Sequence, residues 1–120
     1  MDVPLIIDNA AYQDIVIREG NSHVTLLEFW DTENNPIDLT GYDFKIYLYK
    51  RSRQQEPDIT FEGNDFYIVP TSGSILWKIE GEKTKGKEGV YMYHGDLIDT
   101  STFESLTCLY GKFTIIDKNI

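Results

Sequence analysis

The sequence predicts an all-β protein: an antiparallel β-sandwich of about seven to eight strands, immunoglobulin-like or jelly-roll-like in arrangement. Three observations lead to this fold class. Apolar and polar residues alternate with a period of two along most of the chain, while the helical period of 3.6 is almost absent. The alternating segments are short and are separated by turn-forming residues. The chain has 120 residues, of which 41% are apolar, which is enough for one core.

The clearest strand covers 42–49, where every second residue from Tyr42 to Leu48 is apolar. We expect further strands at 23–30, 74–80, 90–97 and 107–116, and weaker ones at 14–18 and 66–69. Trp30 and Trp77 lie on two of these strands and are expected in the core, with a half-exposed position as the alternative for either. Gly111 interrupts the last strand, and a glycine in that position marks a bulge or a close backbone approach.

The segments between the strands have their own signals. The Asx-rich and proline-containing segment 31–36 predicts a turn. We expect one helical turn within the charged segment 82–89 and a short helix at 101–106, N-capped by Ser101 or Thr102. We treat 1–120 as a single sandwich domain in which 1–13 forms an extended N-terminal arm.

Residues Asp38, Leu39, Thr40 and Gly41 are expected to form a structural corner before the strand at 42–49. Leu39 is apolar and can close the end of the sandwich. Asp38 and Thr40 can hydrogen-bond neighbouring backbone groups as Asx- and ST-turns. Gly41 can adopt the positive φ that such a corner requires. Turn chemistry alone thus accounts for all four residues.

Composition excludes several classes of partner. The net charge is −9, and nucleic acids are bound by clustered Lys and Arg, so we expect no nucleic-acid partner. No apolar run approaches the ~20 residues that span a bilayer, so we expect no membrane partner. Residues 1–40 hold eight acids and one base, Arg18. This asymmetry either gives one end a negative docking face or forms a solvated acidic surface.

Residues capable of catalysis or metal binding are few and scattered. His23 and His94 have no partners at ligand spacing, although a pair between His94 and Asp96 or Asp99 is conceivable. Cys108 is the only cysteine and lies inside a predicted strand, which favours a small buried side chain over a nucleophile. The segment 31–35 lacks the glycine and closing glutamate of a calcium loop. We expect no enzyme activity, no cofactor and no metal.

Tyrosine is the one over-used residue, with eight in the chain. Tyr47 and Tyr49 lie opposite the cleanest apolar face, where a monomer would carry charge. Together with Lys45 and Lys50 they form our candidate interface patch, since exposed apolar patches mark contacts. The alternative is that the tyrosines form cross-strand pairs that only stabilise the sheet.

Three ordered motifs resemble a known group of proteins. They are Asn35-Pro36-Ile37-Asp38-Leu39-Thr40-Gly41, then Gly89-Val90-Tyr91-Met92-Tyr93, then Gly111-Lys112-Phe113-Thr114-Ile115. The order resembles the β-sandwich domains of tailed-bacteriophage virion proteins, especially the N-terminal domains of upper baseplate and fibre-anchoring proteins. The resemblance covers roughly residues 14–116. Proteins of that group usually continue into a coiled coil, shaft or receptor-binding domain, so this chain is either a free-standing component or part of a longer one.

The resemblance implies a structural or adaptor subunit of a phage virion, located in the tail, the baseplate or a fibre attachment. Its partners would be other virion proteins, and a homo-oligomer or ring would cap its free sheet edges. It would be made in the cytoplasm of the bacterial host and reside in the virion. The alternative function is a carbohydrate-binding module for host recognition, with tyrosine and tryptophan as stacking platforms. A small hydrolase is the least supported class, because the sequence contains no catalytic motif.

Overall fold

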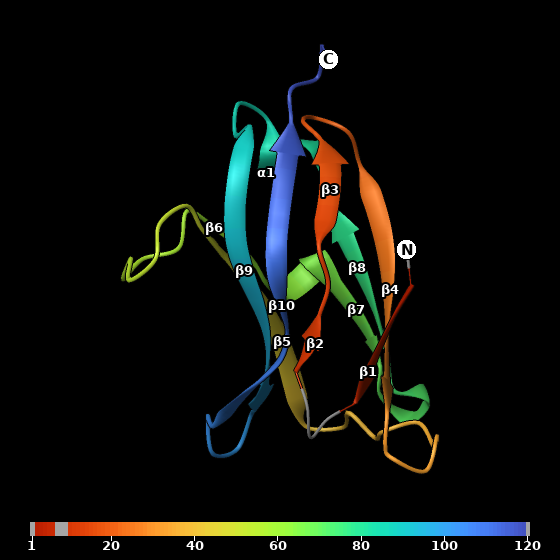
Figure 1. Ribbon diagram of the computed structural model, residues 1–120. Helices are drawn as coiled ribbons and strands as arrows, with labels where there is room; N and C mark the ends of the chain where they lie inside the picture. Colours follow the sequence, from red (N-terminus) through yellow and green to blue (C-terminus); the bar gives the residue numbers. More distant parts are fainter. Residues whose placement is uncertain (1, 7–9, 120) are drawn as a thin grey trace.

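The computed structural model describes residues 2–6 and 10–119 and consists of two β-sheets packed face to face (Figure 1). The four-stranded sheet has the order β1 (Asp2–Ile6), β4 (His23–Trp30), β8 (Ser74–Ile79), β7 (Phe66–Val69). The six-stranded sheet has the order β2 (Ala11–Tyr12), β10 (Ser105–Ile116), β9 (Gly89–Asp99), β5 (Tyr42–Tyr49), β6 (Ile59–Phe61), with β3 (Ile15–Arg18) also paired to β10. The predicted all-β sandwich is confirmed.

Three short helical segments connect the strands in the described part of the chain. They are the 3₁₀ turns η1 (Gly63–Asp65) and η2 (Pro70–Ser72) and the single α-helical turn α1 (Gly81–Thr84). The helical turn expected at 82–89 is therefore present and begins one residue earlier. No helix in the described residues is long and apolar enough to cross a membrane.

The core lies between the sheets and consists of the alternating apolar side chains. Along β5 every second side chain from Phe44 to Leu48 is buried, and the residues between them are half-buried. At the centre, Trp77 is fully buried, and its ring centroid lies 5.2 Å from that of Phe61 and 5.8 Å from that of Phe113. Because both sheets present one apolar face, the period-two pattern identified the core-facing residues of the longer strands.

The N-terminal segment departs from the expected purely antiparallel pairing. β1 pairs in parallel with β4, and β2 and β3 pair in parallel with successive parts of β10, while the other strand pairs are antiparallel. The first part of the chain thus borders both sheets. The expected arm at 1–13 lies partly outside the described residues. Within it, Asp2–Ile6 and Ala11–Tyr12 are strands.

One local prediction is wrong. The helix expected at 101–106 is absent, because the Asp99 carboxylate accepts hydrogen bonds from Ser101 N and Thr102 N and closes a tight turn between β9 and β10. Trp77 is in the core, whereas Trp30 takes the half-exposed alternative because it faces outward from β4. The weaker strands expected at 14–18 and 66–69 are present as β3 and β7.

The segment 38–41 lies at the end of the sandwich where β9 and β10 are joined. Leu39 is buried, and its N–H donates to Pro70 O at 3.0 Å. The Asp38 carboxylate accepts hydrogen bonds from Thr40 N at 2.9 Å and Thr40 Oγ1 at 2.6 Å. These bonds lower the pKa of Asp38. Gly41 has a φ of 84°, which few side chains tolerate.

Gly111 marks a close approach between β10 and the junction of β2 and β3. A β-carbon at Gly111 would lie 2.4 Å from Gln13 O, and the φ of Gly111 is 154°. The same carbonyl accepts a hydrogen bond from the Tyr93 hydroxyl. The bulge itself lies nearby, at Cys108, which allows both Cys108 and Leu109 to face the core.

Candidate functional site

The outer face of the six-stranded sheet carries a row of aromatic side chains. The strand register places Tyr12 beside Tyr110, Tyr110 beside His94, and His94 beside Tyr47. A second row places Met92 beside Tyr49. These side chains come from β2, β10, β9 and β5, which lie side by side in Figure 1. We call them the tyrosine face: Tyr12, Tyr47, Tyr49, Met92, His94 and Tyr110.

The tyrosine face is apolar and partly open to solvent. Tyr12 is 55% exposed, Met92 is 50% exposed and Tyr110 is 42% exposed. Tyr47 and Tyr49 are half-buried, because both pack against the His94 ring. Exposed apolar side chains that are contiguous on one sheet face mark an interaction surface more often than scattered ones do.

Several aromatic rings of the tyrosine face pack against one another. Tyr12 and Tyr110 meet edge to face, with centroids 5.2 Å apart and an interplanar angle of 79°. Tyr49 stacks on His94 at 5.7 Å and 13°, and Tyr47 is tilted by 42° against the same ring. The rings therefore do not form one coplanar platform.

The structure separates the four residues of the predicted interface patch. Lys45, Tyr47 and Tyr49 share the outer face, and Lys45 Nζ lies 3.8 Å from Glu62 Oε1. Lys50 follows the end of β5, and its Nζ lies over the Tyr91 ring at 5.5 Å from the centroid. Lys50 thus extends toward the end of the sandwich and away from the tyrosine face.

Sequence reasoning missed Tyr12, Met92, His94 and Tyr110 as neighbours of Tyr47 and Tyr49. The outward direction of Met92 and Tyr110 was apparent from the alternation in their strands. Their proximity depends on the register between β5, β9 and β10, which no short sequence motif encodes. Tyr91 and Tyr93 belong instead to the core, where both are buried.

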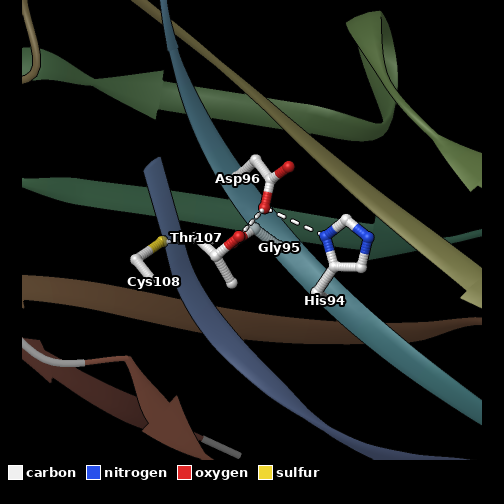
Figure 2. A network of polar contacts seen from close by, with 5 residues as sticks. All are labelled: His94, Gly95, Asp96, Thr107 and Cys108. Atoms are coloured by element: carbon white, nitrogen blue, oxygen red, sulfur yellow. Dashed lines mark hydrogen bonds and ion pairs between the residues drawn. The ribbon is translucent and has the colours of Figure 1, made fainter. Parts of the chain in front are cut away.

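A small polar network borders the tyrosine face (Figure 2). The Asp96 Oδ1 atom accepts a hydrogen bond from Thr107 Oγ1 at 2.8 Å and lies 3.0 Å from His94 Nδ1. Since Asp96 is only 8% exposed, these contacts satisfy a carboxylate that would otherwise be costly to bury. The network fixes the His94 ring against Tyr47 and Tyr49.

The phenols of Tyr47 and Tyr49 remain neutral over a wide pH range. Burial, and then the charge of Asp96, raise the pKa of Tyr47, while burial and the neighbouring Tyr47 raise that of Tyr49. Both are therefore hydrogen-bond donors at neutral pH. Within the described residues, no group of three or more His, Cys, Asp or Glu side chains is placed to hold a metal ion.

Cys108 follows Thr107 along β10, as Figure 2 shows, and its side chain is buried in the core. Its Sγ donates to Gly95 O at 3.5 Å, and burial raises the pKa of the thiol to about 12. Only the thiolate is nucleophilic, and its fraction at pH 8 is on the order of 10⁻⁴.

We therefore expect native Cys108 to be inert to a disulfide reagent at pH 8 and to react fully once urea unfolds the protein. The absorbance of the coloured thiol that the reagent releases measures the reaction in the native and in the unfolded protein. The thiolate fraction rises with pH, so labelling above pH 10 should accelerate even before unfolding. Rapid labelling of the native protein at pH 8 would contradict the buried position.

Comparisons with known proteins reveal a likeness in structure but not in sequence. No protein-family model matches the chain, and no curated protein matches it in sequence. Among solved structures, the chain resembles the N-terminal domain of phage TP901-1 ORF48, with a TM-score of 0.64 and 9% sequence identity. The match covers 95% of each chain. At this identity the match establishes a shared fold.

Proposed function

We propose that this chain is a non-catalytic structural or adaptor subunit of a bacteriophage virion, in its tail, baseplate or fibre attachment, acting through protein–protein contacts. The observation that carries the proposal is the match to a phage domain over 95% of both chains, so the likeness extends over the whole sandwich. The three sequence motifs that resemble those of phage virion proteins support the proposal independently. Synthesis in the bacterial cytoplasm followed by assembly into the particle is part of the proposal.

The tyrosine face is the surface that we assign to these contacts. Interfaces are enriched in Tyr and Met, as this face is. Its side chains stand on regular strands, so their positions are fixed before a partner binds, and little conformational entropy is lost on association. The buried position of the Cys108 thiol supports the non-catalytic part of the proposal.

The geometry favours this function over carbohydrate binding. Sugar rings stack on open aromatic faces. Here Tyr49 and His94 stack on each other, and the edge-to-face Tyr12–Tyr110 contact covers a face of one of its two rings, so part of the aromatic surface is already occupied. Binding to an array of bacterial surface glycans, measured with the purified protein, distinguishes the two functions, and the proposal expects no specific binding.

Introducing a charge into the tyrosine face is expected to block assembly without unfolding the protein. The variant Met92→Glu places a carboxylate at a residue that is 50% exposed. Surface substitutions of this kind change the free energy of unfolding by no more than about 0.5 kcal/mol. The incorporation of this variant into particles should fall at least about 10-fold, because a partner would have to desolvate the charge.

The matched control is Tyr67→Glu, which places the same charge at a residue 64% exposed on the four-stranded sheet. Incorporation is measured by immunoblotting of purified particles from a host that supplies only the variant chain. Equal incorporation of Met92→Glu and wild type would exclude the tyrosine face as the contact surface.

A further inference from the structure

The turn between β9 and β10 displays an aromatic side chain at the end of the molecule. Phe103 is 81% exposed and has a φ of 60°, a left-handed conformation that is rare for a bulky residue. The turn is held by Phe103 N donating to Asp99 O at 2.8 Å and Asp99 N donating to Glu104 O at 2.9 Å. The side chain is thus presented on a preformed support rather than on a loose loop.

Acidic groups flank Phe103 on both sides. Asp99 and Glu104 precede and follow it, and the sequence from 94 to 111 contains neither Lys nor Arg. The loop at 31–41, also without Lys or Arg, lies at the same end of the sandwich, where Thr100 N donates to Gly41 O at 3.0 Å (Figure 1). A surface that accepts Phe103 should therefore be an apolar depression with a basic rim.

The chain itself carries a depression of this kind. It has a volume of about 320 Å³ and lies beside the tyrosine face, with Tyr49, Met92 and His94 among its lining residues. Arg51 and Arg53, both exposed, contribute to the same depression from the loop between β5 and β6. Neither guanidinium forms an ion pair with an acid in the part of the chain that the structure describes.

We propose that Phe103 of one copy of this chain inserts into the depression between Tyr49 and Met92 of the next copy. Glu104 then lies opposite Arg51 and Arg53, where a guanidinium can pair with its carboxylate in a bidentate geometry. The Asp99 carboxylate, which is held within the turn, adds negative charge beside it. The occupant is a second copy because the apolar lining and the basic rim of the depression complement the exposed aromatic and the acidic flanks of the turn.

The contact must join two molecules. Met92 and Asp99 are separated along β9 by seven residues, or about 23 Å at the usual rise of a strand, so the turn does not reach the depression of its own chain. Because two different surfaces meet, the association is head-to-tail and produces either a closed ring or an open filament. The inference rests on the proposed function, since it names the partner of the tyrosine face.

Substituting Phe103 tests the contact without threatening the fold. Asn tolerates the left-handed conformation better than Phe does, so Phe103→Asn should fold at least as stably as wild type. Light scattering across a concentration series should show wild-type oligomers that dissociate on dilution, and a loss of association of at least about 30-fold in Phe103→Asn. The matched control, Tyr67→Asn, removes an aromatic that is 64% exposed on the four-stranded sheet and should associate as wild type does.

A mixing experiment distinguishes a head-to-tail contact from any symmetric one. Phe103→Asn keeps the depression but lacks the anchor, whereas the double variant Arg51→Glu, Arg53→Glu keeps the anchor but has a depression of the wrong charge. Each should be monomeric alone, and an equimolar mixture should form a one-to-one dimer and nothing larger. Raising the salt concentration should weaken both the dimer and the wild-type oligomer, because the paired charges are exposed.

Two results would overturn the inference. One is a wild-type protein that stays monomeric up to about 1 mM, the concentration at which a weak specific contact is half-formed. The other is a mixture of the two variants that does not dimerise. Neither result bears on incorporation into virions, so the proposed function can stand while this inference fails. Conversely, a head-to-tail oligomer that is missing from particles would leave the contact intact and remove the proposed function.

Discussion

Replacing Trp77 by alanine is expected to lower the free energy of unfolding by about 3–5 kcal/mol, the largest effect of any single substitution considered for this chain. Trp77 is fully buried between the two sheets. Its ring contacts those of Phe61, Phe66 and Phe113, with centroid distances of 5.2, 6.2 and 5.8 Å. These rings come from both sheets and cannot close the resulting cavity without moving the strands that carry them.

The conservative variant Trp77→Phe separates two contributions of Trp77 to stability, the packing of its ring and the unpaired indole N–H. The Trp77 Nε1–H is buried and has no hydrogen-bond partner within the described residues. An unpaired buried donor of this kind costs about 1–3 kcal/mol, so removing it offsets part of the lost packing. We expect Trp77→Phe to destabilise the protein by less than about 1.5 kcal/mol.

Urea unfolding followed by far-ultraviolet circular dichroism measures both Trp77 variants, and it avoids relying on the fluorescence of the tryptophan that has been removed. A cost of Trp77→Ala below about 1 kcal/mol, the average for any substitution, would contradict the central position of Trp77. A cost of about 3 kcal/mol or more for Trp77→Phe would contradict the expected gain from removing the unpaired indole N–H.

The second large effect is expected at Gly111. Replacing it by alanine should lower the free energy of unfolding by about 3 kcal/mol or more, because the backbone conformation is strained for alanine and its β-carbon overlaps a neighbouring atom. The new β-carbon would lie 2.4 Å from the backbone oxygen of Gln13, closer than any ordinary contact. Relieving the overlap would move Gln13 and break its hydrogen bond from Tyr93, as well as the bond from Lys112 N to the Asp14 carboxylate. The edge formed by β2 and β3 would then separate from β10.

Gly86→Ala is the matched control for this substitution. Gly86 has a positive φ of 72°, but no atom lies within 4 Å of the position that its β-carbon would take. Alanine there should lower the free energy of unfolding by only about 1–2 kcal/mol, the cost of placing a β-carbon in the left-handed conformation. Equal decreases in melting temperature for Gly111→Ala and Gly86→Ala would refute the close approach at Gln13. Hydrogen exchange should also rise in β2 and β3 only in Gly111→Ala.

The extent to which the sequence predicts this fold depends on strand length and on burial. β4, β5, β8 and β9 each have one apolar face, so their period-two pattern alone locates them and orients side chains such as Phe44. β6 and β2 have three and two residues, too few for any period to be recognised. The turn at 99–104 resembles a helix start, since Asp99 caps Ser101 and Thr102 as an N-cap would.

The candidate site was predictable only in part, for a different reason. The alternation around Tyr47 and Tyr49 indicated two outward tyrosines on one strand. Whether other aromatics join them depends on how β9 and β10 align with β5, and a shift of one residue would turn Tyr91 outward in place of Met92. The depression beside Tyr49 depends in addition on the loop at 50–58, whose conformation is set by Asp58 accepting hydrogen bonds from Lys50 N and Gln54 Nε2.

The measurement that tests the virion role most directly is the amount and position of this chain in purified particles. Phage released from the bacterium that produces the chain would be banded by density, quantified by mass spectrometry and labelled with gold-conjugated antibody. We expect a fixed molar ratio to the other tail proteins and a label at one site on the tail. A chain that stays in the soluble host fraction, with none in the banded particles, would contradict it.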